Sequence, residues 1–186
     1  MSESAADPQV AEAEGQRLFG QGKYRDAADQ FCLAQHAYAA TGDDLRSAEM
    51  LNNAGVAYRR ARKHKEAITA LEEARRIFAH LGDQPREAQA LGNLGGLYSK
   101  TKRYDQAETC FLHAISIFQD LDDRGRQSET LRAMAIMQFK RRQYSQAMAT
   151  YEDAMVFLPN PTPLQQILRF LLRVRGLITR IFSVFK

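Results

Sequence analysis

Two asparagines stand 40 residues apart in this chain, in the same local context. Asn53 and Asn93 each precede a glycine by two residues, Gly55 in one case and Gly95 in the other. An asparagine amide offers both hydrogen-bond donors and an acceptor, so a ladder of such amides can pair with the backbone of an extended peptide whatever its side chains. The alternative is structural: the two amides satisfy neighbouring helix ends.

Other residues that support chemistry in proteins lack the necessary spacing. The four histidines are His36, His64, His80 and His113. No two of them share a helical face, and none stands beside a cysteine ligand, so a metal site is not expected. Cys32 and Cys110 are expected to be buried, reduced thiols, in keeping with a cytoplasmic location. We find no glycine-rich phosphate loop and no nucleophile with a base, and therefore expect no enzyme activity and no cofactor.

The spacing of the asparagines is also the period of most of the sequence. Four segments are similar to one another: KYRDAADQF, HKEAITAL, RYDQAETCF and QYSQAMATY. Their first alanines are Ala27, Ala67, Ala107 and Ala147. Small residues recur twelve positions earlier, at Gly15, Gly55, Gly95 and Ala135, and bulky residues recur four positions later, at Phe31, Leu71, Phe111 and Tyr151. A fixed period of 20 to 50 residues is typical of a solenoid built from stacked units.

Each unit contains two segments in which apolar and small residues fall three and four positions apart. Leu51, Ala54, Gly55 and Tyr58 are one example. This spacing predicts amphipathic helices, and no segment alternates with the period of two that a strand requires. A glycine inside a helix costs about 1 kcal/mol relative to alanine. We interpret the recurring glycine as permitting close approach between two helix backbones.

The repeated pattern resembles the tetratricopeptide repeat. The residues that carry the resemblance in one unit are Gly95, Tyr98, Tyr104, Ala107, Phe111 and Ala114. The chain departs from that family in lacking tryptophan and in having a period of 40 rather than 34 residues. Six more residues correspond to nearly one extra turn on each helix, as in the longer repeats of kinesin light chains and spindle-orientation adaptors. The resemblance implies an all-α, right-handed solenoid of four helix pairs, whose first helices line a concave groove.

The predicted organisation has four parts. They are a disordered N-terminus without a signal peptide (1–7), four repeats (8–159, divided at about 8–43, 44–83, 84–123 and 124–159), a proline-rich break (160–163) and a basic amphipathic C-terminal helix (164–186). The break is predicted because three prolines within LPNPTP, which begins at Leu158, stop a helix. The last part carries five positive charges of a net +4, so the repeats are close to neutral.

The resemblance places Asn53 and Asn93 in the groove, where the long-repeat adaptors use asparagine to hold a peptide. The outer units have Ala13 and Ala133 at this position, so only the central units carry the feature. Further peptide-binding residues are predicted at Gln16, Arg60, Gln89, Lys100, Arg132 and Lys140. Their positive charge favours an extended, acidic or carboxylate-bearing peptide. Charges at the helix ends also complement the helix dipoles, which is the structural alternative. Nucleic acid is disfavoured, because no aromatic residues are interleaved with these charges.

The C-terminal segment has two competing interpretations. Its apolar face can cap the fourth repeat, or it can lie on an anionic membrane with arginines reaching the phosphates. The docking residues in the second case are Arg169, Arg173, Arg180, Phe182 and Phe185. Self-association or folding back into the groove are further alternatives, whereas a transmembrane span is disfavoured because arginines interrupt every window.

The sequence as a whole predicts a non-enzymatic adaptor for a protein or peptide partner in the cytoplasm. One alternative is a peripheral membrane protein that is anchored by the C-terminal helix and uses the repeats as a scaffold. Another is a secretion-type chaperone that shields an apolar segment of its partner.

Overall fold

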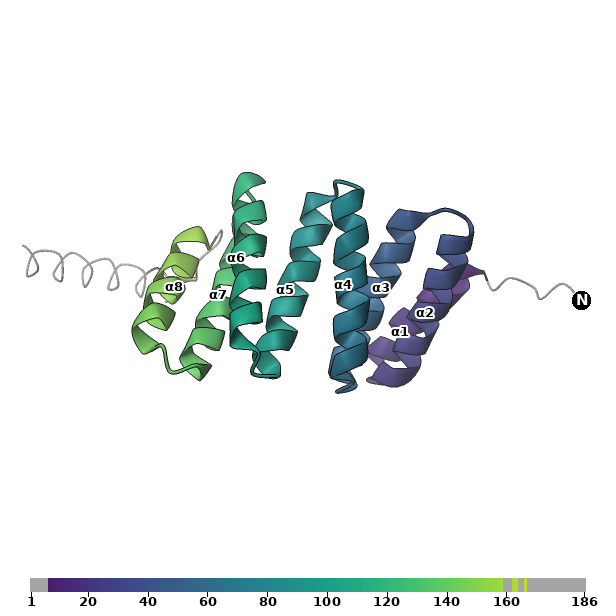
Figure 1. The fold of residues 1–186 in the computed structure, drawn as a ribbon, viewed down its shortest axis with the longest axis horizontal. Coiled ribbons are helices and arrows are strands. Elements are labelled where there is room, and N and C mark those ends of the chain that lie inside the picture. Colours follow the sequence, from purple (N-terminus) through teal and green to yellow (C-terminus); the bar gives the residue numbers. More distant parts are fainter. Residues whose placement is uncertain (1–6, 159–161, 164–165, 167–186) are drawn as a thin grey trace, which may run out of the picture. The chain divides into compact units, whose positions relative to one another are not determined.

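The computed structural model describes residues 7–158, 162, 163 and 166, and within these it contains helices and no strands. Successive helices form pairs joined by short turns (Figure 1). Their bounds are α1 Pro8–Gly20, α2 Tyr24–Ala40, α3 Asp44–Arg60, α4 His64–His80, α5 Gln84–Lys100, α6 Tyr104–Asp120, α7 Arg124–Lys140 and α8 Tyr144–Phe157. The predicted all-α solenoid of repeated helix pairs is confirmed.

The helix boundaries reproduce the 40-residue period. The first helices of the second, third and fourth pairs begin at Asp44, Gln84 and Arg124. Helices α2 to α7 each have 17 residues, and α8 has 14. The expectation that the longer period adds to the length of each helix is therefore met, because a three-residue turn leaves 17 residues for each half of a 40-residue unit.

Aspartates determine where three of the first helices begin. The side chains of Asp43, Asp83 and Asp123 each accept a hydrogen bond from the backbone N–H three residues later, at 3.0 to 3.1 Å. Such caps satisfy donors that have no partner within the helix, and the negative charge complements the helix dipole. For these three aspartates, capping and the helix dipole are a sufficient explanation of the charge at the helix start.

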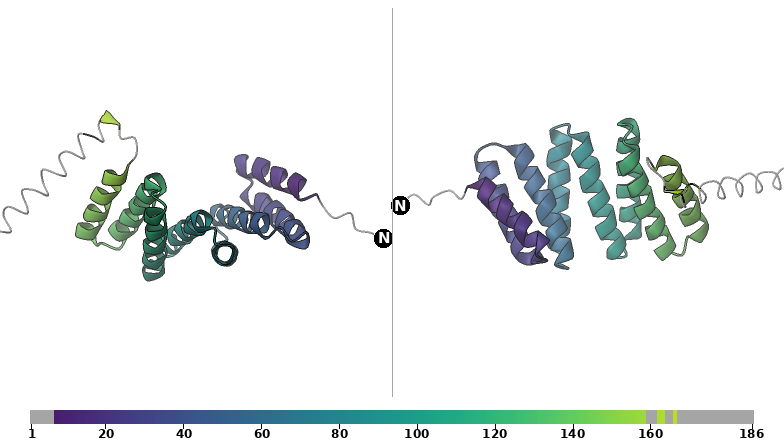
Figure 2. Two further views of the ribbon diagram at one scale, coloured as in Figure 1. Left: turned by 90° about the horizontal axis from the view of Figure 1, so that it is seen from above. Right: turned by 180° about the vertical axis from the view of Figure 1, so that it is seen from behind.

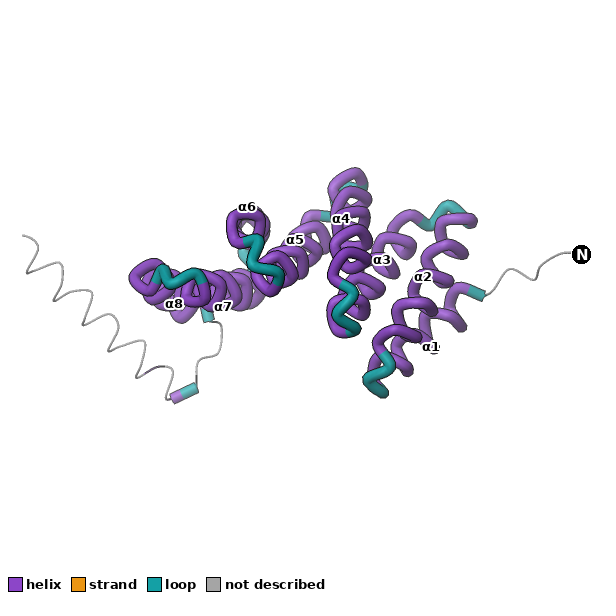
Figure 3. The backbone as a smooth tube through the Cα atoms, turned by 60° about the horizontal axis from the view of Figure 1, so that its bottom comes forward, coloured by secondary structure: helices purple, strands orange, loops and turns teal. Residues whose placement is uncertain are grey.

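Each turn contains one residue with a left-handed backbone conformation. The seven residues are Gly22, Gly42, Arg62, Gly82, Lys102, Asp122 and Arg142, with φ between 50° and 76°. The backbone N–H that follows reaches back to the last turn of the helix, as when Lys63 donates to the carbonyl of Tyr58 at 2.9 Å. This arrangement ends an α-helix and reverses the chain within three residues. The short turns between helices are visible in Figure 3.

The chain divides into two compact units, and each is described by itself. The first ends at Ile117 and the second begins at Phe118, inside α6. The helices of both units are shown from two further directions in Figure 2. In the first unit, Phe31 of α2 packs in one cluster with Met50 and Ala54 of α3. The second helix of one pair therefore shares its core with the first helix of the next pair.

The recurring glycines mainly accommodate bulky side chains of the second helix of the same pair. A Cβ atom added at Gly95 would lie 2.7 Å from the ring of Phe111, and one added at Gly15 would lie 2.8 Å from the ring of Phe31. At Gly55, the Cβ would lie 2.6 Å from Cγ of Leu71. The interpretation as close backbone approach is therefore met only at Gly55, where the Cβ would also lie 3.3 Å from the carbonyl oxygen of Ala67 on α4. The bulky residue four positions after each repeat alanine fills the space that the glycine leaves.

A buried tyrosine of the first unit, Tyr98, has a raised pKa. The hydroxyl of Tyr98 donates to Glu72 Oε1 at 2.6 Å. Burial and, after it, this hydrogen bond to a carboxylate raise the pKa of Tyr98 to about 12. In the unfolded chain the pKa of tyrosine is about 10. Between these values the unfolded state loses the phenolic proton while the folded state keeps it, so stability falls as the pH rises.

We predict that the free energy of unfolding declines between about pH 10 and pH 12, by at most about 1.4 kcal/mol per pH unit for this residue. The Tyr98→Phe variant should show a shallower decline, because it has no phenol to ionise. Urea titrations of both proteins at pH 8, 10 and 11 measure the difference. Parallel pH profiles would contradict the assignment.

The C-terminal helix predicted for residues 164–186 lies outside the described residues except at Gln166, as do residues 1–6 of the predicted N-terminal segment. Helix α8 ends at Phe157, immediately before LPNPTP. Beyond the prolines, the backbone N–H of Gln166 donates to the carbonyl of Thr162 at 2.9 Å, a spacing of four residues that is found in α-helices.

Candidate peptide-binding groove

A groove of about 520 Å³ runs across the first helices of the first unit. It is lined by Gln16 and Phe19 of α1, Phe31 of α2, Asn52, Asn53 and Val56 of α3, and Gln89 and Asn93 of α5. Five of these eight side chains carry an amide group. The groove is therefore rich in neutral groups that both donate and accept hydrogen bonds, and its aromatic residues supply apolar contact.

The two predicted asparagines have different surroundings. Asn93 Nδ2 donates to Oδ1 of Asn52 at 3.1 Å, which joins α5 to α3. The side chain of Asn53 is half-buried and has no hydrogen-bond partner within the described part of the chain. One amide is thus oriented by a neighbour, and the other is available to a ligand. Neither side chain satisfies a helix end.

Sequence analysis missed Asn52, which is only 7% exposed. The residues at the same position of the other three repeats are Glu12, Gly92 and Arg132. Recurrence along the sequence does not reveal Asn52, because asparagine occurs at this position in one repeat only. Its role depends on Asn93 of the following repeat and becomes apparent only when the two helices are placed side by side.

A chain of ion pairs links the first helices on one side of the groove. Arg46 of α3 lies 2.7 Å from Glu12 of α1 and 3.0 Å from Glu49 of its own helix. Arg86 of α5 lies 2.7 Å from Glu49 and 2.7 Å from Asp83. Both arginines are partly exposed, so each pair contributes only about 0 to 1 kcal/mol to stability. Their charges are nevertheless neutralised by carboxylates of the protein.

A second pocket of about 180 Å³ adjoins the groove at these ion pairs and shares three of its lining residues, Asn52, Asn53 and Gln89. Its polar lining includes the carboxylates of Glu12 and Glu49. This side of the groove, near the beginnings of the first helices, therefore combines amides with acidic groups.

Beyond the residues that line the groove, toward the C-terminal end of α3, lies an arginine that has no carboxylate partner among the described residues. Arg59 is half-buried, and within the described residues no carboxylate lies within ion-pair distance of its guanidinium group. Its Nη1 atom would lie 3.2 Å from a Cβ added at Gly96, one turn beyond Asn93 on α5. Burial and the nearby charge of Arg60 lower the pKa of Arg59. The glycine gives space to a cation that lies against α5.

Four of the eight predicted peptide-binding residues meet in the groove, namely Gln16, Asn53, Gln89 and Asn93. Arg60 and Lys100 are exposed residues at the ends of α3 and α5 and do not line it. Arg132 and Lys140 are exposed on α7 in the second unit. The five predicted membrane or partner-docking residues from Arg169 to Phe185 lie outside the described residues.

The described residues also bear on the requirements of a metal site, a reactive thiol and a membrane span. Among the described residues, no cluster of three or more His, Cys, Asp or Glu side chains could hold a metal ion. Cys32 and Cys110 are free and half-buried, and burial raises the pKa of the Cys110 thiol. None of the helices in the described part has the length and apolar character needed to cross a membrane.

Stacked helix pairs with a groove along the first helices define a repeat scaffold of the tetratricopeptide type. The tetratricopeptide repeat family model matches residues 46–120 and 86–156, which together span more than half of the chain. The chain therefore belongs to the tetratricopeptide repeat family. Proteins of this family are generally non-catalytic scaffolds for protein–protein interaction, so membership supports a protein partner.

Two solved structures share the fold. The crystal structure of BtubC (BKLC) from P. vanneervenii matches with a TM-score of 0.73 and 23% identity, over 87% of this chain and 71% of that one. Aspartyl phosphate phosphatase F from Bacillus subtilis matches with a TM-score of 0.75 and 12% identity, over 84% of this chain and 41% of the phosphatase. Such low identities indicate a shared fold alone. No curated protein matches the sequence.

Proposed function

We propose that this chain is a non-enzymatic adaptor that binds an extended, carboxylate-bearing peptide in the groove of its first unit. The observation that carries the proposal is the convergence of Gln16, Asn53, Gln89 and Asn93, from three successive first helices, on one groove. Amides can pair with both the N–H and the C=O groups of a peptide backbone. The site therefore suits an extended segment whose backbone groups are not already paired.

The two asparagines contribute in different ways to this binding. Asn93 is held by Asn52, so its amide is already oriented before a peptide arrives. Asn53 has no such partner and gains a hydrogen bond when a peptide binds. Pre-orientation lowers the entropy cost of binding, and a new hydrogen bond from the half-buried, unpaired amide of Asn53 is favourable.

Charge gives the groove a direction. Arg59 is three residues beyond Val56, the last α3 residue that lines the groove, and has no carboxylate partner among the described residues. Arg60 and Lys100 are at the same ends of α3 and α5. Glu12 and Glu49 are near the opposite ends of the first helices. Guanidinium groups bind carboxylates through charge-assisted hydrogen bonds. We therefore place the acidic group of the peptide beside Arg59.

A display library of random 12-residue peptides, selected on the immobilised full chain, tests this function. We expect enrichment of peptides that contain Asp or Glu. Binding of an enriched peptide, followed by fluorescence anisotropy, should weaken by about 1 to 3 kcal/mol, or roughly 5- to 150-fold in Kd, when Asn53→Ala and Asn93→Ala are combined. Gln119→Ala, which removes an exposed amide outside the groove, is the control and should leave the Kd unchanged.

The charge preference is tested separately with Arg59→Met. This variant should weaken an acidic peptide but leave the affinity of the same peptide with its acids replaced by amides nearly unchanged. Equal effects on both peptides would contradict the position of the acidic group. Enriched peptides that bind the double asparagine variant as tightly as the parent would exclude the groove as the binding site.

A further inference from the structure

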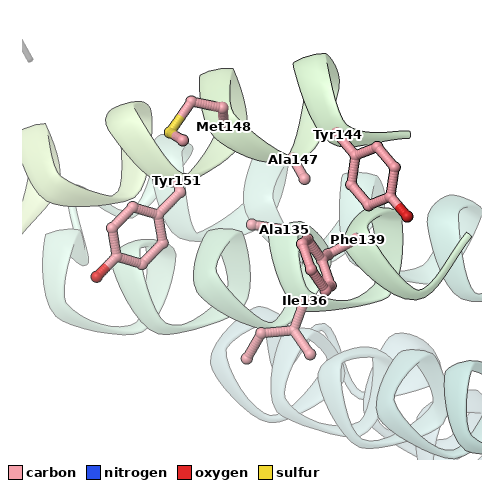
Figure 4. Close-up of a pocket in the computed structure, with 7 residues that line it drawn as sticks. All are labelled: Ala135, Ile136, Phe139, Tyr144, Ala147, Met148 and Tyr151. Carbon is pink, nitrogen blue, oxygen red and sulfur yellow. The ribbon is translucent and has the colours of Figure 1, made fainter. Parts of the chain in front are cut away.

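The second unit has an apolar pocket of about 470 Å³ on the α7 and α8 pair. Figure 4 shows the residues that line it: Ala135, Ile136 and Phe139 of α7 and Tyr144, Ala147, Met148 and Tyr151 of α8, with Phe139 beside Tyr144. Phe139 is 63% exposed and Ile136 is 55% exposed. Large apolar side chains gathered in this way are unusual on a free surface and indicate that another element packs there.

The first unit shows which element covers these positions. Residues 120 positions apart, or three periods, occupy the same place in their repeats. Met148 and Tyr151 therefore correspond to Ala28 and Phe31, and Phe139 corresponds to Phe19. Ala28 and Phe31 lie in one core cluster with Met50, Ala54 and Ala57 of α3, and Phe19 packs against that cluster. The pocket therefore has the position that the first helix of a following repeat covers.

The chain contains a segment with the corresponding register. Residues 164–180 stand three periods, or 120 residues, after residues 44–60, which form α3. Phe170, Val174 and Leu177 stand at the positions of Met50, Ala54 and Ala57, which are the residues that α3 contributes to the core cluster.

Three arginines of the segment also agree with this register. Arg169 and Arg173 correspond to Glu49 and Asn53 on the groove side of α3, and Arg180 corresponds to the exposed Arg60 at its end. An independent amphipathic helix has no reason to place its apolar and polar faces in phase with a 40-residue repeat. A half-repeat requires this phase, because its apolar residues must meet the preceding pair.

We propose that residues 164–180 form a fifth first helix that packs into the α7 and α8 pocket of the same chain. The hydrogen bond from Gln166 N–H to the Thr162 carbonyl is consistent with a helix that begins at Pro163. Proline is favoured at the first helical position, and α1 begins in the same way, with Pro8 following the capping Asp7. The packed helix buries its apolar face and presents Arg169 and Arg173 on the groove side of the second unit instead of to lipid.

The absence of tryptophan from the sequence allows a direct test in the full chain. Single tryptophans are introduced as Phe170→Trp or Leu177→Trp on the apolar face and, as a matched control, as Arg173→Trp on the polar face. In buffer, we expect blue-shifted emission and severalfold weaker quenching by acrylamide at 170 and 177 than at 173. Equal quenching at all three positions would overturn the proposal.

A second substitution tests whether the pocket is the binding surface. Met148 is 44% exposed in the described structure, so Met148→Glu should leave α7 and α8 folded. Combined with Phe170→Trp, it should increase quenching of the tryptophan to the level of the control, with little change in helix content by circular dichroism. If quenching of Trp stays unchanged in this double variant, the helix does not occupy the pocket.

Two further measurements distinguish other occupants and other roles. Protection that appears only after addition of phosphatidylserine and phosphatidylcholine vesicles would overturn the proposal in favour of a membrane helix. Protection that disappears on dilution, together with a dimer in sedimentation, would assign the pocket to the segment of a second copy. Protection in the monomer supports docking within one chain. None of these measurements depends on peptide binding in the first unit.

Discussion

The Gly95→Leu variant is expected to melt well below the parent protein. A Cβ at this position would lie 2.7 Å from the ring of Phe111, which is only 1% exposed and cannot move into solvent. Overpacking of a core costs about 1 to 3 kcal/mol and at times more. The rest of the leucine side chain then has no space between α5 and α6. Thermal and urea unfolding followed by circular dichroism measure the loss.

Another glycine of the same helix is a matched control. Nothing lies within 4 Å of a Cβ added at Gly92, so Gly92→Ala should stabilise the chain by about 0.5 to 1 kcal/mol through helix propensity alone. Opposite signs for Gly92→Ala and Gly95→Leu would show that the contact with Phe111, and not the conformational preference of glycine, explains the recurring position. A Gly95→Leu variant as stable as the parent would refute the repeat register.

The Phe78→Ala variant is expected to lose about 3 to 5 kcal/mol of stability, the usual cost of removing a buried aromatic side chain. Phe78 of α4 is 2% exposed and belongs to a cluster with Ala48 of α3 and Ala90 of α5. Its ring therefore connects one helix pair to the next. The midpoint of urea unfolding, at an unchanged slope, measures the effect.

Leu112→Ala is the control for this second prediction. Leu112 lies on α6 and is 52% exposed, so its truncation should change stability by less than about 0.5 kcal/mol. If the losses from Phe78→Ala and Leu112→Ala were similar, the cluster around Phe78 would not be the contact that stabilises successive repeats.

The sequence was sufficient to predict the repeat and its helices. The period that relates Ala27 to Ala67, Ala107 and Ala147 also relates the starts of α2, α4, α6 and α8. This prediction succeeded because each unit repeats the same local requirements: an apolar stripe on each helix, a capped start and a three-residue turn. Features that every repeat needs recur along the chain, and such recurrence can be recognised from the sequence alone.

The groove was predicted only in part. Asn53 and Asn93 were found because they recur, and the structure brings both into one groove with Gln16 and Gln89. The raised pKa of Tyr98 could not be predicted, because it depends on burial and on the carboxylate of Glu72 in the preceding repeat. Likewise, the glycine pattern predicted a tight contact but not its partner, the bulky side chain on the second helix.

The sequence by itself determined the tetratricopeptide architecture and the 40-residue period. Only the tertiary structure decided that Asn52 holds Asn93, that Arg59 lies against Gly96 and that α7 and α8 present an apolar pocket. The physical reason is that each feature depends on contacts between particular helices, and the residue pairs that make the Asn52–Asn93 and Arg59–Gly96 contacts do not recur in the other repeats. Periodicity encodes what the repeats share, whereas packing between particular repeats creates the sites in which they differ.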